Sequence, residues 1–127
     1  MKPVYLLDTD VVSEPLRPSP SRHVVDRLRE YDGVVAIAAV VWHELLYGVS
    51  RLPDGQRKRR IRAYMYDVVA PSIPVLPYDE AAAALHAQMR TDASAAGKPL
   101  SFTDGMIAAI TRTNNLLLVT RNTTDFA

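Results

Sequence analysis

Short apolar runs alternate along the chain with longer stretches in which apolar residues recur at helical spacing. The apolar runs cover residues 4–7, 34–38, 73–76 and 116–120. Runs of this length without regular polar alternation are typical of strands buried on both faces of a parallel sheet. The stretches between them predict helices over residues 9–16, 23–31, 40–52, 56–69, 80–96 and 101–114. Because strands and helices alternate, we expect an α/β fold whose mainly parallel central sheet carries helices on both faces.

Several residues in these segments carry specific local predictions. Asp79 is expected to cap the helix that follows it, and Asp10 to cap the helix after the first strand. Ser101 and Asp104 have the spacing of a capping box. The apolar residues expected to pack from the 40–52 and 56–69 helices are Val41, Leu45, Tyr47, Val49, Leu52, Ile61, Met65, Val68 and Val69.

The composition suits one domain and limits the chemistry available to it. The 127 residues are 48% apolar and 23% charged, which are ordinary values for a globular domain with one core. No cysteine is present, so disulfides, thiolate zinc sites and cysteine nucleophiles are excluded. His23, His43 and His86 fall in separate segments, and we treat the last two as ordinary helix residues. Any metal would then need oxygen ligands, which favours magnesium or manganese.

Two further features bear on location and partners. No apolar run reaches the ~18 residues of a membrane span and the start lacks a signal-peptide pattern, so we expect a cytoplasmic protein without membrane contact. The formal net charge is only +1. Six basic residues nevertheless lie between positions 51 and 62, namely Arg51, Arg57, Lys58, Arg59, Arg60 and Arg62. This basic run is either a solvated helix face or a contact for a polyanion.

Acidic side chains fall where predicted strands end and the following helices start. Asp8 directly follows the first strand, Glu44 lies in the first turns of the 40–52 helix, and Asp104 lies in the first turn of the 101–114 helix. The polar segment 120–126 follows the last strand. In a parallel sheet these positions share one edge, outside the carboxyl ends of the strands, where ligands bind. We therefore expect the functional acids to converge on Asp8.

Clustered carboxylates raise one another's pKa by repulsion, and a divalent cation offsets that repulsion. An acidic site without His or Cys is the pattern of a metal-dependent nuclease, in which Mg²⁺ activates a water beside a phosphodiester. Plainer explanations exist for Asp104 as part of a helix cap, Glu44 as a solvated helix residue and Asp125 as part of a surface turn. Arg121, beside the acids, is either a phosphate contact or an ion-pair partner.

Four blocks of the sequence resemble the signature blocks of PIN-domain ribonucleases. The blocks are LLDTDVVSE at 6–14, ELLYG at 44–48, TDGMIAA at 103–109 and VTRNTTDF at 119–126. Their order and spacing are similar to those of the VapC toxins of bacterial toxin–antitoxin pairs, including the FitB-like branch. The resemblance implies a single three-layer α/β/α domain over residues 1–127 that cleaves RNA with Mg²⁺, or with Mn²⁺ in its place.

The same resemblance assigns roles to individual residues. It implies that Asp8 and Asp104 bind the metal directly, and that Glu44 binds it through water or orients the attacking water. The fourth position, often Asp in the family, is Asn122 here, which lacks the charge and leaves the number of metal ions open. Asp125 is a candidate to compensate for it.

Partners are implied as well. The family forms homodimers, and a small antitoxin docks into the active-site groove, often with a basic side chain among the acids. For the RNA substrate, Arg121 and the basic-run residues Arg59 and Arg60 are candidate contacts. Two further positions depart from the family: Asp10, where Asn is more common, and the alanines at 38–39, where a Ser or Thr often caps the helix.

Two other functions stay open at this point. Asp8-Thr9-Asp10 after an apolar strand is similar to the first motif of haloacid-dehalogenase-type phosphatases, with Asp8 as nucleophile and Asp10 as acid/base. The remaining motifs of that family are missing. The other alternative is a PIN-like domain that binds RNA or protein without catalysis, and its support is the amide at Asn122.

Overall fold

Four parallel strands form the centre of the computed structural model, which describes residues 2–121 of the chain. The strands are β1 (Tyr5–Leu7), β2 (Val35–Ala38), β3 (Val75–Leu76) and β4 (Leu117–Val119). Their order across the sheet is β3-β2-β1-β4, and each neighbouring pair is parallel. The predicted parallel sheet is confirmed, with each strand one or two residues shorter than its apolar run.

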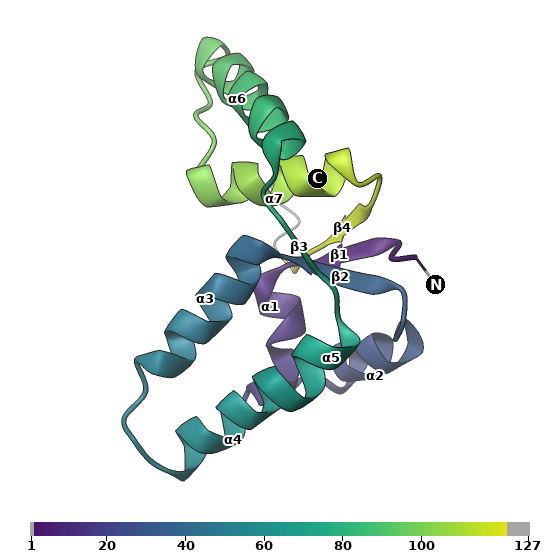
Figure 1. The fold of residues 1–127 in the computed structure, drawn as a ribbon, viewed down its shortest axis with the longest axis vertical. Helices are drawn as coiled ribbons and strands as arrows, with labels where there is room; N and C mark the ends of the chain where they lie inside the picture. The colour runs from purple at the N-terminus through teal and green to yellow at the C-terminus, as the bar shows by residue number, and fades with distance from the viewer. Residues whose placement is uncertain (1, 122–127) are drawn as a thin grey trace.

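Helices cover both faces of this sheet. In chain order they are α1 (Thr9–Val12), the 3₁₀ turn η1 (Glu14–Leu16), α2 (Arg22–Glu30), α3 (Ala39–Ser50), α4 (Gln56–Tyr64), the π-helical segment η2 (Met65–Val69), α5 (Ala70–Ser72), α6 (Glu80–Ala95) and α7 (Phe102–Thr113). Figure 1 shows α6 and α7 on one side of the sheet and α1 to α5 on the other. The expected three-layer α/β/α arrangement is confirmed.

The starts of the two long C-terminal helices follow the sequence signals. Asp79 caps α6, where its Oδ1 accepts a hydrogen bond from the amide of Ala82 at 2.9 Å. Ser101 caps α7, where its Oγ accepts a hydrogen bond from the amide of Asp104 at 3.1 Å. These side chains satisfy amides that have no partner within the helix, which fixes where α6 and α7 begin.

Asp10 does not cap α1, and that prediction is wrong. The helix begins at Thr9, so the capping position falls on Asp8, whose Oδ1 accepts a hydrogen bond from the amide of Thr9. Asp10 instead lies exposed in the first turn, 3.8 Å from Arg17 Nη2. Asp8 therefore combines two positions, the end of a buried strand and the start of a helix.

The predicted single helix over residues 56–69 contains a π-helical segment. The amide of Ala70 donates a hydrogen bond to the carbonyl of Met65, which lies five residues earlier instead of four. The wider turn changes which residues share a face, so Val68 is 50% exposed and our prediction that it faces inward is wrong. Ile61, Met65 and Val69 are buried as predicted.

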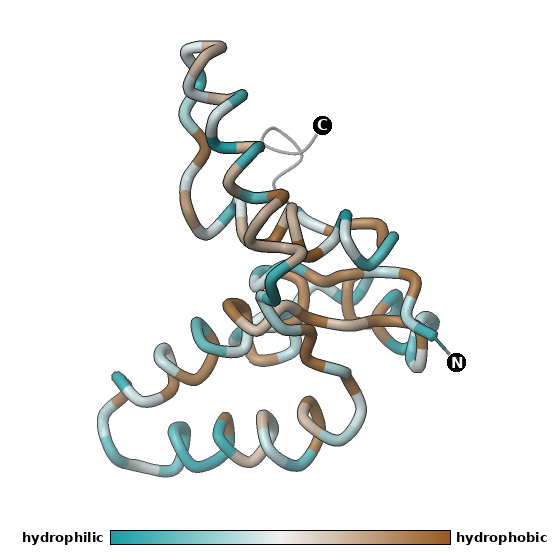
Figure 2. The backbone as a smooth tube through the Cα atoms, turned by 45° about the horizontal axis from the view of Figure 1, so that its top comes forward, coloured by the Kyte–Doolittle hydropathy of each residue, from teal (hydrophilic) through white to brown (hydrophobic). Residues whose placement is uncertain are grey.

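The hydrophobic core lies between the sheet and the helices. Figure 2 shows hydrophobic residues concentrated along the strands and on the helix faces that cover them. The largest fully buried apolar side chains include Leu6, Ile37, Met65, Ile107 and Ile110. Tyr47 of α3 was also expected to pack but is 56% exposed. Among residues 2–121, no helix combines the length and the apolar character needed to cross a bilayer.

Candidate active site

The strand order reverses between β1 and β4. From β1 the chain reaches β2 through α1 and α2 on one face, whereas β4 is reached through α6 and α7 on the opposite face (Figure 1). In open parallel sheets, ligands bind at such a reversal, outside the carboxyl ends of the two strands. Asp8 follows β1 and Thr120 follows β4, so these two residues mark the expected position of a site.

Asp8 is held at this position from two sides. Its Oδ1 accepts a hydrogen bond from the amide of Thr9 at 2.8 Å, and its Oδ2 accepts one from Thr120 Oγ1 at 3.0 Å. The amide of Asp8 donates to the carbonyl of Val119 at 3.0 Å, which extends the ladder between β1 and β4 by one residue. Both carboxylate oxygens therefore have fixed directions in a half-buried side chain.

Glu44 reaches the same place from α3. Its Oε2 accepts a hydrogen bond from Thr9 Oγ1 at 3.1 Å. Thr9 therefore binds two acids at once, Asp8 through its amide and Glu44 through its hydroxyl. The expected convergence of Asp8 and Glu44 is present, and the residue that joins them was not identified from the sequence.

Asp104 lies in the first turn of α7, and α7 contacts both α3 and β4. Its amide is bound to the cap residue Ser101, and its carboxylate is half-buried. Within residues 2–121, no group of three His, Asp or Glu side chains is close enough to hold one metal ion. Asn122 and Asp125, which the sequence also suggested, lie outside the described residues.

Within residues 2–121, no basic side chain balances the charge of these acids. The ion pairs described within residues 2–121 join Arg17 to Asp10 and Glu14, Arg27 to Glu30, Lys58 to Asp54, and Arg121 to Glu14. In that part of the chain, Asp8, Glu44 and Asp104 have no lysine or arginine within ion-pair distance. The described partners of the Asp8 and Glu44 carboxylates are neutral donors, namely one amide and two threonine hydroxyls.

A buried glutamate next to the site was missed by the sequence reasoning. Glu14 is only 2% exposed, and its Oε1 accepts hydrogen bonds from the amide of Ser21 at 3.0 Å and from Arg121 Nη1 at 2.8 Å. Its Oε2 lies 2.8 Å from Arg17 Nε, an ion pair whose angle falls outside hydrogen-bond geometry. Of our two explanations for Arg121, the ion-pair partner is therefore present, with Glu14 as the acid.

The surroundings of Glu14 favour its charged form. The Ser21 amide is the main cause of a lowered pKa for the Glu14 carboxyl, and the charges of Arg121 and Arg17 add to it against the opposing effect of burial. Arg121 follows Thr120, whose hydroxyl holds Asp8. Glu14 thus anchors the end of β4 beside Asp8. The available signal was an acid inside an apolar segment, which must find partners when it is buried.

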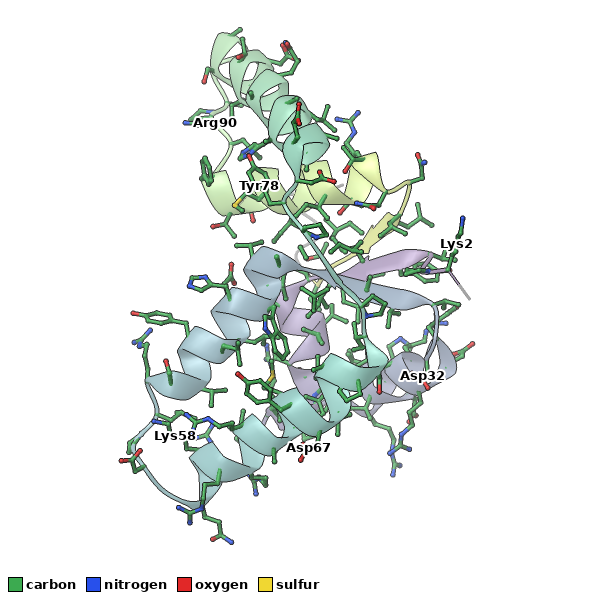
Figure 3. All side chains as sticks on the ribbon, viewed as in Figure 1. Lys2, Asp32, Lys58, Asp67, Tyr78 and Arg90 are labelled. Atoms are coloured by element: carbon green, nitrogen blue, oxygen red, sulfur yellow. The ribbon has the colours of Figure 1, made fainter. Side chains whose placement is uncertain are left out.

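His86 is buried behind the first turn of α7. The prediction that it is an ordinary helix residue is therefore wrong. Its Nδ1 lies 2.8 Å from the hydroxyl of Tyr78, which precedes α6 (Figure 3), and its ring contacts that of Phe102 edge-on. Burial lowers the pKa of His86, and the charge of Arg90 lowers it further. A Cβ added to Gly105 would clash with the His86 ring, so glycine allows this close contact beside Asp104.

A pocket of about 330 Å³ opens next to Arg121, between α2 and the carboxyl ends of β1 and β4. Its lining is mainly apolar and includes Leu7, Val24, Leu28 and Val119. Thr120 and Arg121 form its edge toward Asp8. The acids and an apolar pocket therefore adjoin at one end of the sheet.

Comparison with known proteins agrees with this geometry. The family model for the PIN domain matches residues 5–127. Toxin FitB of Neisseria gonorrhoeae is 39% identical over 128 residues, covering 97% of this chain and 91% of the relative. The tRNA(fMet)-specific endonuclease VapC of Shigella flexneri is 33% identical, covering 96% of this chain and 89% of the relative.

The fold agrees with a solved relative as well. The structure of FitAB bound to an IR36 DNA fragment contains a chain that superimposes with a TM-score of 0.88 at 37% identity, covering 97% of this chain and 88% of that one. Sequence and fold therefore place this chain in the PIN-domain family, among the toxin nucleases of the FitB and VapC type.

Proposed function

We propose that this chain is a metal-dependent endoribonuclease that acts in the cytoplasm as the toxin of a toxin–antitoxin pair. The observation that carries the proposal is the Asp8–Thr9–Glu44 arrangement at the reversal between β1 and β4. Two carboxylates from different elements are fixed there by one residue. The described part of the chain supplies no cationic side chain to balance them, which is an unfavourable arrangement without a bound cation.

The donor set fits a hard divalent ion. Asp8 and Glu44 offer only oxygen atoms, and oxygen ligands are the ones that Mg²⁺ and Mn²⁺ prefer. Asp104 belongs to the set through its place at the start of α7 and through the family resemblance of TDGMIAA. When bound, such an ion stabilises the developing charge of a phosphodiester and lowers the pKa of a nearby water.

The protein's own residues would orient the attacking water and the metal ligands. Glu44 keeps Oε1 free of described partners while Oε2 is held by Thr9, so the free oxygen is placed to accept a proton from an attacking water. We propose Asp8, fixed by Thr9 and Thr120, as the first ligand and Asp104, in the first turn of α7, as the second. We propose that Asn122 completes the site as a neutral ligand.

The same surface suits an antitoxin. The FitB relative occurs in a complex named FitAB, and the acids of this chain would accept a basic side chain from a partner of that kind. The pocket beside Arg121 would take an apolar side chain of the same partner. We further propose a homodimer, which light scattering on the purified chain tests directly.

The phosphatase alternative has less support. A haloacid-dehalogenase site requires Asp8 and Asp10 to work together, yet Asp10 is exposed and lies near Arg17. The family match to the PIN domain also points away from it.

The test is RNA cleavage by the purified chain with Mg²⁺, with Mn²⁺ and with chelator. Asp8→Asn and Asp104→Asn are compared with Asp67→Asn, a control at an exposed acid on η2 (Figure 3). We expect metal-dependent cleavage by the parent and the control, and loss of cleavage in both site variants with unchanged melting curves. Equal activity in all four proteins would remove the acids from the mechanism. Absence of cleavage by the parent, with intact RNA binding, would favour the binding-only alternative.

A further inference from the structure

The outer face of α3 carries an exposed stack of rings and charge next to Glu44. The rings of His43 and Tyr47 lie 6.2 Å apart with an interplanar angle of 18°, and the guanidinium carbon of Arg51 lies 5.3 Å from the centre of the Tyr47 ring. All three side chains are exposed, with Tyr47 at 56%. Exposed rings that stack on each other and lie next to a guanidinium offer a surface on which a planar ligand can stack.

The spacing of His43, Tyr47 and Arg51 places them in a stripe along α3 that runs next to Glu44. Residues of an α-helix turn by about 100° each, so positions 43, 47 and 51 form a stripe that drifts by about 40° per step. The drift brings Arg51 close to the angular position of Glu44, and Tyr47 is one turn from Glu44 at i+3. The buried residues Val41, Leu45 and Val49 face the opposite way.

Gly48 lies between these residues and is exposed. A glycine inside a helix lowers its stability relative to alanine. No atom of residues 2–121 lies within 4 Å of a Cβ placed on Gly48, and the Gly48 backbone has no positive φ. Neither packing nor backbone conformation in the described structure therefore requires glycine at this position, one turn after Glu44. A ligand that approaches the helix backbone closely at this position would account for the glycine.

The basic run follows this stripe in the sequence, on the next helix α4. Figure 1 shows α3 and α4 as a hairpin that projects from the sheet, and Lys58 lies near its tip (Figure 3). Lys58 is used within the hairpin, since its Nζ donates to the carbonyl of Ser50 and pairs with Asp54. The other basic residues after the turn are exposed and form no ion pair in the described part of the chain; they are Arg57, Arg59, Arg60 and Arg62.

We propose that the outer face of α3 binds a single-stranded segment of the RNA substrate and leads it to the acids, an inference that rests on the proposed function. One base stacks on Tyr47, the strand backbone passes over Gly48, and Arg51 with the exposed arginines of α4 contacts phosphates. Stacking on aromatic rings combined with a cationic path is how proteins hold single strands. The exposed arginines of the adjoining α4, which have no ion pair in the described part of the chain, favour a polyanion over a protein surface.

Binding is measured by fluorescence anisotropy with a labelled single-stranded RNA and Mg²⁺, in an Asp104→Asn parent that does not cut. Tyr47→Leu is expected to weaken binding about tenfold through the lost stacking. The matched control Tyr66→Leu removes another exposed tyrosine, on η2, and leaves affinity unchanged. The double variant that combines Arg59→Glu and Arg60→Glu is expected to reduce the salt dependence of RNA binding.

The variant Gly48→Ala distinguishes two roles for Gly48, a contact with RNA and a role in helix stability. The added methyl should raise the melting temperature by about 4 °C through helix propensity and weaken RNA binding at least threefold. In the cleaving chain, Tyr47→Leu and Gly48→Ala should raise KM and leave kcat unchanged. Duplex RNA binding should not respond to either variant.

Three outcomes overturn the proposal. The first is that the parent does not bind single-stranded RNA, and the second is that Tyr47→Leu and Gly48→Ala bind it as the parent does. The third is that these variants change the oligomeric mass in light scattering and keep RNA affinity, which would make the face a protein interface. Binding lost in the variants while the original chain fails to cleave RNA would support this inference and overturn the proposed nuclease activity.

Discussion

Thr9 Oγ1 donates a hydrogen bond to Glu44 Oε2 at 3.1 Å, while the amide of the same residue binds Asp8 at 2.8 Å. One threonine therefore sets the distance between two acids that lie 36 positions apart in the sequence. Because α1 begins at Thr9, the geometry of the acids is tied to the start of a helix rather than to a loop. A site on a rigid element is held more accurately than a site on a loop.

Thr9→Val is the direct test of this bridge. The variant keeps the hydrogen bond from the residue 9 amide to the Asp8 carboxylate. It also keeps the shape of the side chain and replaces only the hydroxyl. A hydrogen bond to a charged group contributes about 1.5–3 kcal/mol, so we expect cleavage to fall by about 10- to 100-fold. Thr9→Ser restores the hydroxyl and should recover most of the activity. Equal rates for the Val and Ser variants would show that the bridge has no role in cleavage.

Glu14 gives a prediction about acid stability. Its pKa is lowered in the folded protein, chiefly by the Ser21 amide, so its charged form stabilises the fold above the ordinary pKa of 4.5. That stability is lost as pH falls below 4.5 toward the lowered pKa. Glu14→Gln should therefore lower stability at pH 7 and reduce the loss on acidification, measured by urea unfolding at pH 7 and pH 3.5. Glu30→Gln, at an exposed ion pair, is the control and should follow the parent at both pH values.

The fold was predictable because burial leaves a pattern in consecutive residues. Strands covered on both faces show continuous apolar runs, and the caps at Asp79 and Ser101 depend on residues three positions apart. The placement of Asp8 and Glu44 followed from the shared edge of a parallel sheet. The ion pair between Glu14 and Arg121 joins residues 107 positions apart, and no local pattern reports such a contact.

Other errors have local causes. Val68 has the spacing of a buried α-helical residue, but the π-helical segment moves it outward. Asp10 and Asp8 are both plausible caps in sequence, and the choice depends on where β1 ends. Tyr47 fits an apolar stripe only loosely, and its exposure became interpretable once its contacts with His43 and Arg51 were visible.

His86 gives a second pH dependence, at a higher pH. Burial lowers its pKa below the ordinary 6.5, so the folded protein keeps the ring neutral while the unfolded chain takes up a proton. Stability is then complete above pH 6.5 and declines as pH falls from 6.5 toward the lowered pKa. His86→Gln keeps a partner for the Tyr78 hydroxyl and should flatten this decline in thermal unfolding between pH 7.5 and 5.5. An exposed histidine, replaced in His23→Gln, should leave the slope as it is in the parent.

Two glycines in helix interiors are expected to respond in opposite ways to alanine. Gly48 has open space around it, so Gly48→Ala should stabilise the fold by about 1 kcal/mol through helix propensity.

Gly105 lies against the ring of His86, which Tyr78 and Phe102 hold in place, so the new methyl forces a shift. Overpacking of this kind destabilises by about 1–3 kcal/mol. The measurement is urea unfolding of both variants, with a midpoint change at constant slope read as a change in stability. Cleavage should fall in Gly105→Ala, because the displaced turn of α7 carries Asp104. Two variants that shift in the same direction would show that α6 and α7 adjust freely at this contact, and Gly105 would then have no part in positioning Asp104.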